Sequence, residues 1–289
     1  MIGWIDTVLQ GVMLGGLYAL FAMGLALMFG VMRLVNIAHG DFIVLAAFLA
    51  IGVALGVQIT PALIVLVVLP VMLAVGYGLQ RGVLNRTLGK DILPPLLVTF
   101  GLSIVIQNVL LEAFSADSRS LSAGGIETQS LRIAGDLAVG WLPLLTLVAA
   151  LALASGLEWL FGRTRLGRAF RATSDDPEAA ALQGIDHRHV YALATAIAFG
   201  VVTVAGLFLA MRTTVAPSDG PAYLLYAFEA VIIGGLGSFW GTLVGGLVLG
   251  VAQGIGFRFD PGWGILVGHL VFLAVLLVRP QGLFPRTRD

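Results

Sequence analysis

GVMLGGLYALFAMGLALMFG, residues 11–30, contains no charged residue over twenty positions. A helix of about twenty apolar residues is long enough to cross the hydrocarbon core of a bilayer. The whole chain shares this character, because 58% of its 289 residues are hydrophobic, 11% are charged and the mean hydropathy is +1.00. A soluble protein carries about 25% charged residues. The sequence therefore predicts an all-α, polytopic transmembrane helical bundle.

Further charge-poor runs predict where other helices cross the membrane. A run at residues 224–236 is too short to cross comfortably, and we interpret it as a half-helix or a broken span. We expect about eight full spans plus this short helix, within a single transmembrane domain over residues 1–289. The polar segments 115–138 and 162–188 are then loops rather than separate domains. The predicted full spans are residues 7–30, 41–57, 61–80, 92–114, 139–161, 190–211, 238–257 and 263–278.

Basic residues predict the orientation of the bundle. Most of the 16 basic residues fall in three segments, at residues 81–90, 163–188 and 279–288. By the positive-inside rule these segments face the cytoplasm. The loop at residues 115–138 then lies outside the membrane, the N-terminus also lies outside, and the C-terminus is cytoplasmic.

A polar stretch interrupts the apolar sequence after the first predicted span. It reads VNIAHGDF and places Asn36, His39 and Asp41 beside Gly40. Polar and ionisable groups at membrane depth are costly, so such a cluster is a candidate functional site. One interpretation is that these residues line or gate a solute path. The other is that Asn36 or Asp41 only caps a helix that begins near Phe42.

The span at residues 92–114 carries polar residues along one helical face. Thr99, Ser103 and Gln107 follow each other at four-residue spacing, and Asn108 lies beside Gln107. Hydroxyls and amides of this kind commonly hydrogen-bond between transmembrane helices. We favour that interpretation for Thr99 and Ser103. For Gln107, a role in the wall of a polar path is an equal alternative.

Glycines cluster in the predicted short helix and in the span that follows it. Gly234, Gly235 and Gly237 form an elbow, because three glycines in four residues weaken a helix. Backbone groups freed at the elbow need protein or water as partners, so the elbow is a candidate for the path wall. The stripes that follow favour close packing between helices instead. These stripes are Gly237, Gly241 and Gly245, and Gly246, Gly250 and Gly254.

The cytoplasmic segment 162–188 predicts a helix of about two turns. Asp176 suits its N-cap, Pro177 its first position and Gly184 the residue after its end. Such a short helix is marginal in water and needs something to pack against. Two interpretations remain open on the residues alone: the helix packs on the protein's own spans, or it docks a cytoplasmic partner.

Several function classes are excluded by what the sequence lacks. The only lysine, Lys90, lies outside any nucleotide-binding P-loop pattern, and no zinc-site spacing is present. Acidic and basic residues cancel, so no nucleic-acid partner is implied. His187 and His189 lie in a predicted loop and His269 is isolated in an apolar span, so we expect no role for them. We therefore expect no enzymatic activity, no metal and no cofactor in this chain.

Four motifs in order give the chain a family resemblance. They are LVNIAHGDF (residues 34–42), TFGLSIVIQN (99–108), FEAVIIGGLGSFWGTLVGG (228–246) and RPQGLFP (279–285). Together they resemble the H-type permease subunit of ATP-binding-cassette (ABC) importers for branched-chain amino acids. Any one match is weak in so apolar a chain, whereas four in order along nearly its whole length are specific.

The resemblance gives the short cytoplasmic helix a role. Permeases of ABC importers carry a loop with the pattern E-A-A, three residues, then G, which docks into a groove on the ATPase. Here Glu178, Ala179 and Ala180 are followed at that spacing by Gly184, although the usual downstream I-x-L-P is missing. The resemblance therefore implies an ATPase-coupling helix at residues 176–184. Its residues are Asp176, Pro177, Glu178, Ala179, Ala180, Leu182 and Gly184.

The resemblance also implies partners and a location. They are a second homologous permease, two cytoplasmic subunits that bind ATP and Mg²⁺, an extracytoplasmic solute-binding protein and the lipid bilayer of a bacterial inner membrane. The solute would be a branched-chain amino acid or a related small polar molecule. The candidate residues of its path are Asn36, His39, Asp41, Gln107, Asn108, Gly234, Gly235 and Gly237.

Two other functions fit the composition. The first is a stand-alone secondary transporter that uses His39, Asp41 or Glu229 as a proton site. The second is a passive channel for a small polar solute such as urea or an amide. Either would work without ATP-binding partners.

Overall fold

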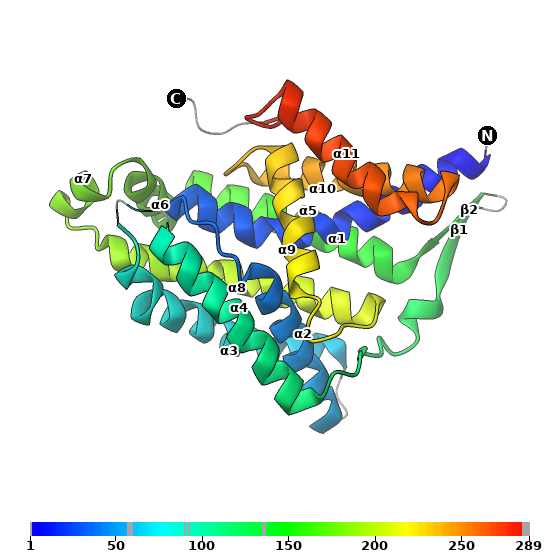
Figure 1. Ribbon diagram of the computed structural model, residues 1–289, viewed down its shortest axis with the longest axis horizontal. Coiled ribbons are helices and arrows are strands. Elements are labelled where there is room, and N and C mark those ends of the chain that lie inside the picture. Colours follow the sequence, from blue (N-terminus) through cyan, green and yellow to red (C-terminus); the bar gives the residue numbers. More distant parts are fainter. Residues whose placement is uncertain (1, 57–59, 90, 92, 135–136, 285–289) are drawn as a thin grey trace.

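The protein is an all-α bundle, as the sequence predicts (Figure 1). A computed structural model describes residues 2–56, 60–89, 91, 93–134 and 137–284. The ends of the predicted spans at residues 57 and 92, together with Lys90 and Pro285, lie outside the described residues. The helices are α1 (Ile2–Met32), α2 (His39–Gly56), α3 (Pro61–Gly82), η1 (Leu84–Arg86), α4 (Leu93–Phe114), η2 (Ile126–Thr128), α5 (Trp141–Arg163), α6 (Arg165–Asp175), α7 (Pro177–Leu182), α8 (His187–Arg212), α9 (Gly220–Gly234), α10 (Phe239–Phe259) and α11 (Trp263–Val278).

Seven helices of the described chain are long and apolar enough to cross a membrane, namely α1, α2, α3, α4, α5, α8 and α10. The predicted short helix is present as α9, which has 15 residues. The predicted eighth full span corresponds to α11, which has only 16 residues. At about 1.5 Å per residue, α11 is about 24 Å long and falls short of a core of about 30 Å. The predicted bounds, residues 263–278, are those of α11, which is one of the shorter apolar helices rather than one of the seven long ones.

Both long loops contain structure that the sequence analysis did not predict. The loop before α5 ends in an antiparallel hairpin of β1 (Ser130–Ala134) and β2 (Leu137–Gly140). The loop after α5 contains α6 before the predicted two-turn helix, α7. The side chain of Phe170 in α6 is fully buried, so α6 packs its apolar side on the bundle. In Figure 1 the hairpin and the N-terminus lie at one end of the molecule, and α6 and α7 lie at the other.

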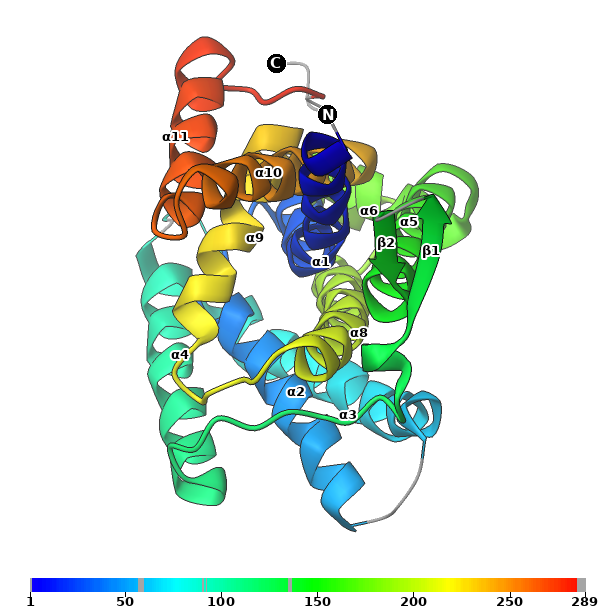
Figure 2. The same cartoon turned by 90° about the vertical axis from the view of Figure 1, so that its right-hand side faces the viewer.

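Helix α1 is the centre of the bundle, with α5, α8, α9 and α10 around it (Figure 2). It packs most extensively on α10, where glycines on both helices bring the backbones together. A Cβ atom added to Gly15 would lie 2.5 Å from the Leu247 Cα and 2.7 Å from the Gly246 carbonyl oxygen. Such close contacts provide dispersion energy where lipid removes the hydrophobic driving force. The predicted packing role of the stripe at Gly246 and Gly250 is confirmed.

Exposed tryptophans mark both ends of the spans. Trp4, Trp141 and Trp263 begin α1, α5 and α11 at the hairpin end, whereas Trp159 and Trp240 lie toward the α6–α7 end. Trp141 and Trp159 are eighteen positions apart in α5, which corresponds to about 27 Å of helix. Tryptophans gather at the two membrane–water interfaces. The distance between Trp141 and Trp159 is therefore close to the thickness of a hydrocarbon core of about 30 Å whose plane is perpendicular to α5.

Closing the space at Gly15 should destabilise the bundle. In Gly15→Ala the new methyl group would collide with the α10 backbone, so we expect a loss of about 1–3 kcal/mol of stability, typical of overpacking. The measurement is the thermal unfolding midpoint of the purified protein in detergent.

Gly78→Ala in α3 is the matched control, because nothing lies within 4 Å of a Cβ at that position. Alanine favours a helix over glycine, so this control should unfold at the same temperature or higher. Equal losses in both variants would contradict the close α1–α10 contact.

Candidate functional site

The polar break between α1 and α2 is a hydrogen-bonded turn that starts α2. The Ala38 N–H donates to Asn36 Oδ1 over 3.0 Å, and the His39 N–H donates to the Asn36 carbonyl oxygen over 3.1 Å. Asn36 is fully buried. Helix α2 begins at His39, three residues before the predicted start near Phe42. Asp41 is therefore inside the first turn of α2, where a carboxylate is favoured by the helix dipole.

His39 ties α2 to α1. Its Nε2 lies 2.8 Å from the Phe21 carbonyl oxygen. Because a carbonyl oxygen only accepts, Nε2 carries the hydrogen and donates it. The imidazole is fully buried and packs so closely that a Cβ on Gly24 would lie 2.9 Å from its Cε1. This position makes His39 a link between two helices, and its predicted place in a path wall stays a prediction.

Asp41 and Gln107, two of the predicted site residues, lie together. Gln107 Nε2 is 2.9 Å from Asp41 Oδ1 and 3.1 Å from Ser103 Oγ. One turn further along the same face, Thr99 Oγ1 accepts the Ile37 N–H over 3.2 Å. The polar face of α4 is thus bonded to the break and to the first turn of α2. The prediction that Thr99 bonds to another part of the bundle is confirmed, whereas the bond that Ser103 accepts from Gln107 lies within α4.

The start of α9 completes this cluster. A Cβ atom on Gly220 would overlap the Asp41 carboxylate, and one on Gly40 would overlap the Gly220 carbonyl oxygen. Glycine is therefore required at both positions for the two helices to meet at Asp41. The sequence analysis missed Gly220. Its neighbours in SDGP are turn formers, so the sequence could have predicted that a helix starts there. The sequence could not have predicted the contact of Gly220 with Asp41.

Asn108 and the glycine elbow lie apart from the Asp41 cluster. Asn108 is exposed and donates to the Ile104 carbonyl oxygen of its own helix over 2.8 Å. The elbow follows α9, whose other end contacts Asp41, so α9 separates the two by about 21 Å. The structure therefore groups Asn36, His39, Asp41 and Gln107, and leaves Asn108, Gly234, Gly235 and Gly237 outside that group.

The elbow is held by the C-terminal segment. Leu283 N–H donates to the Ile233 carbonyl oxygen and Phe284 N–H to that of Gly234, each over 2.9 Å. Gly235 and Gly237 have φ values of +104° and +80°, which favour glycine. A Cβ on Gly282 would lie 2.5 Å from the Gly235 Cα. Backbone carbonyl groups at the elbow are thus hydrogen-bonded to the C-terminal segment. Inside a bilayer such groups need protein partners, because lipid offers none.

A second polar pair was missed by the sequence analysis. His269 Nδ1 in α11 lies 2.5 Å from Glu229 Oε1 in α9, and Glu229 is 1% exposed. The expectation that His269 is isolated was therefore wrong. Two ionisable residues in neighbouring apolar helices were a usable signal, because such residues pair with one another within membranes. The pair fastens the peripheral helix α11 to α9.

The two-turn helix at the other end has the expected caps. Asp176 Oδ1 accepts the N–H groups of Glu178 and Ala179, each over 2.9 Å, and Gly184 has a φ of +82°. Leu182 at the end of α7 is 87% exposed.

Helix α7 is connected to the bundle on both sides. Before it, Ser174 Oγ donates to the Gly30 carbonyl oxygen of α1 over 2.9 Å. After it, Asp186 Oδ1 accepts the Arg188 N–H and so caps α8, while Asp186 Oδ2 lies 3.2 Å from Arg81 Nη1 of α3. Burial alone would raise the pKa of Asp186, but the Arg81 guanidinium and the capped N–H groups outweigh it and hold the pKa below its usual value.

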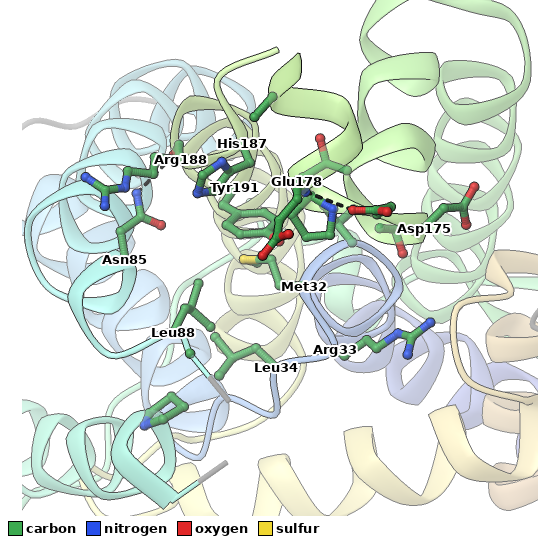
Figure 3. A pocket seen from close by; sticks show the side chains of 18 of the residues that line it. Met32, Arg33, Leu34, Asn85, Leu88, Asp175, Glu178, His187, Arg188 and Tyr191 are labelled. Carbon is green, nitrogen blue, oxygen red and sulfur yellow. Dashed lines mark hydrogen bonds between the residues drawn. The ribbon is translucent and has the colours of Figure 1, made fainter. Parts of the chain in front are cut away.

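A cavity of about 890 Å³ lies beside α7 (Figure 3). Glu178 and Tyr191 project into it, and Met32, Leu34 and Leu88 line it from the bundle. The cavity reaches the segment that leads from α1 to the polar break. Within the described residues, no group of three or more potential metal ligands occurs.

Known proteins are similar to this chain, several of them over nearly its whole length. Residues 7–278 match the family described as the permease component of branched-chain amino acid transport systems. The high-affinity branched-chain amino acid transport permease BraD of Pseudomonas aeruginosa is 30% identical, over 98% of this chain and 96% of that protein. The corresponding LivH protein of Escherichia coli K12 is 29% identical with the same coverage. The fructose import permease FrcC of Rhizobium meliloti is 30% identical over 72% of this chain and 62% of its own. No solved structure matches.

Removing the Gln107 amide should destabilise the protein. In Gln107→Leu the buried Asp41 carboxylate loses the Gln107 donor, and loss of a hydrogen bond to a buried group costs about 1–3 kcal/mol. The thermal unfolding midpoint in detergent should fall accordingly.

Asn108→Leu is the neighbouring control, since Asn108 is exposed and bonds only within its own turn in the described structure. It should unfold close to the unaltered protein. If Gln107→Leu is as stable as Asn108→Leu, the Asp41–Gln107 bond is not part of the packed bundle.

Proposed function

The chain belongs to the family of branched-chain amino acid transport permeases, and from this membership we propose that it forms one transmembrane half of an ATP-driven importer. Its solute is a branched-chain amino acid or a related small polar molecule. The chain forms part of the translocation path and supplies no catalytic group of its own. ATP and Mg²⁺ are bound by partner subunits.

The observation that carries the proposal is the shape of α7. Six residues form too short a helix to be stable in water alone, yet α7 contacts little besides α6 and the start of α8. Its caps hold it in place, and Leu182 stands 87% exposed at its end. A capped helix with an apolar tip, outside the spans, fits a groove on a second protein. Of the two interpretations of this helix, docking is therefore favoured over packing on the chain's own spans.

We place α7 in the cytoplasm, where an ATP-binding subunit would meet it. The basic segments around it support this orientation, with the N-terminus and the β1–β2 hairpin outside and the C-terminus inside. Two such ATPases would bind one α7 each from this chain and from a second, homologous permease. An extracytoplasmic binding protein would deliver the solute at the hairpin end.

The hydrogen bonds around α7 offer a route for coupling. Closure of the ATPases would push α7, which is fastened to α1 through Ser174 and to α3 through Asp186 and Arg81. Because α1 leads directly into the polar break, a displacement of α1 would also move Asn36 and Asp41. The spans would then rock between outward-open and inward-open states.

The path residues divide by role in this proposal. Asp41 and Gln107 contact the solute or gate its passage where α2, α4 and α9 meet. Asn36 and His39 support that site by fixing the turn and joining α2 to α1. Gly234, Gly235 and Gly237 hold the C-terminal segment rather than lining the path, and Asn108 faces lipid or the second permease.

The buried Glu229–His269 pair favours one alternative, a secondary transporter driven by protons. In sealed vesicles that contain this chain alone, that alternative predicts solute uptake driven by a proton gradient. The importer predicts no uptake by the chain alone under the same gradient. A passive channel predicts flux down the solute gradient without ATP or protons.

Substitution of Leu182 tests the docking role of α7. Leu182→Asp places a charge where an apolar contact is proposed, so affinity for the ATP-binding subunits should fall about thirtyfold, as at an interface hot spot. The measurement is copurification of the ATPases with the tagged permease, together with solute-stimulated ATP hydrolysis.

Leu182→Met is the matched control, because methionine keeps the apolar volume and should bind normally. The thermal midpoint of the isolated permease should be the same for both variants, since Leu182 is exposed. Normal ATPase binding by Leu182→Asp would show that Leu182 of α7 is not part of the docking surface.

A further inference from the structure

The cavity beside α7 is large enough to hold a small molecule. Its volume of about 890 Å³ lies within the range of about 300–1,000 Å³ that is typical of ligand sites. One side of it is formed within residues 173–191, and the other by residues 31–35 and by residues between Asn85 and Leu96. Because residues 31–35 lead directly to Asn36, a ligand in the cavity would contact both α7 and the chain that enters the polar break.

The wall on the side of the bundle is apolar. Met32 and Leu34 contribute to it from the end of α1 and the residues that follow, and Leu88 from the segment between α3 and α4 (Figure 3). The ring of Tyr191 in α8 lies beside them. Burial of an aliphatic group against such a wall is favourable by about 0.8 kcal/mol for each CH₂ that leaves water. The wall therefore fits the aliphatic part of a ligand.

The opposite wall offers polar groups that have no partner in the described chain. The Glu178 carboxylate projects into the cavity and takes part in no hydrogen bond or ion pair there, since Glu178 is bonded to Asp176 only through its N–H (Figure 3). Thr173 in the same wall is fully buried, and its hydroxyl has no hydrogen-bond partner. An unsatisfied buried polar group is costly, so polar atoms brought by a ligand would make this wall more stable.

The charges of the lining favour a cationic group over an anionic one. Four acidic and two basic residues occur among the described lining residues, namely Asp91, Asp175, Asp176, Glu178, Arg33 and Arg188. Figure 3 shows both arginine side chains directed away from Glu178. His187 packs against the Tyr191 ring, with ring centroids 5.9 Å apart. Glu178 therefore faces the cavity without a neighbouring cation, and a carboxylate in this position attracts an ammonium group.

Helix α7 uses different sides for the cavity and for its exposed tip. Glu178 and Ala181 are three positions apart, so they share one side of the helix, and both line the cavity. Leu182 does not line it and is 87% exposed. A ligand in the cavity and an ATP-binding subunit on Leu182 can therefore be bound at the same time.

We propose that this cavity binds the transported amino acid after its release, with the ammonium group at Glu178 and the aliphatic side chain against Met32 and Leu34. The bound amino acid joins α7 to the end of α1 and opposes the displacement of α7 that coupling requires. Solute that accumulates in the cytoplasm thus slows ATP hydrolysis. This inference rests on the proposed importer function, which supplies the class of solute and the cytoplasmic location of α7.

The first test is competition against radiolabelled L-leucine bound to the purified full chain in lipid nanodiscs. N-acetyl-leucine has no ammonium group and should compete at least about threefold more weakly than leucine, the effect of an exposed ion pair. Alanine lacks most of the aliphatic group and should compete about tenfold more weakly. Leucinamide keeps the ammonium group and loses the carboxylate, so it should compete at least as well as leucine. No leucine binding at millimolar concentration, or equal competition by N-acetyl-leucine and leucine, would overturn the inference.

The second test assigns the binding to this cavity. Glu178→Gln keeps the shape of the side chain and removes its charge, so leucine affinity should fall at least about threefold. Asp175→Asn is the matched control, because it makes the same change in a lining residue whose side chain is directed away from Glu178 (Figure 3). The thermal unfolding midpoint checks that both variants are folded, and leucine should raise it in the unaltered chain. An equal fall in both variants, or in neither, would overturn the assignment.

The third test measures the regulation in the complete complex in nanodiscs, where both sides are accessible. With saturating solute-loaded binding protein, ATP hydrolysis should fall as free leucine occupies the site, and N-acetyl-leucine should have less effect at the same concentration. ATP hydrolysis that does not change while leucine is bound would overturn the regulatory role. Failure of the ATPases to copurify with the unaltered chain would overturn the proposed function instead.

Discussion

The structure depends on one constraint, that backbone and polar groups inside a membrane need protein partners where helices are interrupted. The described chain has such an interruption after α1 and another after α9. At the first, Asn36 closes the turn, Thr99 accepts the Ile37 N–H and His39 donates to α1. At the second, residues 283 and 284 bond to the end of α9. The position of α4 against α2, and that of the C-terminal segment against the elbow, follow from these requirements.

The same bonds give the bundle its mechanical layout. Helix α1 is held tightly by α10 through glycine contacts, so it behaves as a rigid axis, and α7 is fastened to its end through Ser174 and Gly30. The Asp41 cluster lies where α2, α4 and α9 meet, and α4 makes few other contacts with the described chain. In the proposed mechanism, a displacement of α9 would act on Asp41 through Gly220, whereas the glycine contacts of α1 and α10 would persist. Helix α7 and the β1–β2 hairpin lie at opposite ends of the bundle (Figure 1).

Local rules were sufficient for much of this fold. The spans follow from charge-free runs, and the caps of α7 follow from Asp176, Pro177 and Gly184, because a cap depends on neighbours within four residues. The polar face of α4 followed from its spacing, although its partner on α2 did not. The pairs that were missed join distant positions: Glu229 and His269 are 40 residues apart, and the tail meets the elbow across all of α10 and α11. No periodicity in one sequence records such contacts, and the same limit hid the pairing of β1 with β2 and that of Arg119 with Val215.

The central claim is that this chain works only as part of an assembly driven by ATP. The most direct measurement is a native mass spectrum of the complex purified through a tag on this chain, from cells that also express the neighbouring genes. The account predicts one copy of this chain with a second permease of similar size and two ATP-binding subunits. A spectrum that contains this chain alone, or only multiples of it, would contradict the account and direct attention to Glu229 and His269 as a proton site.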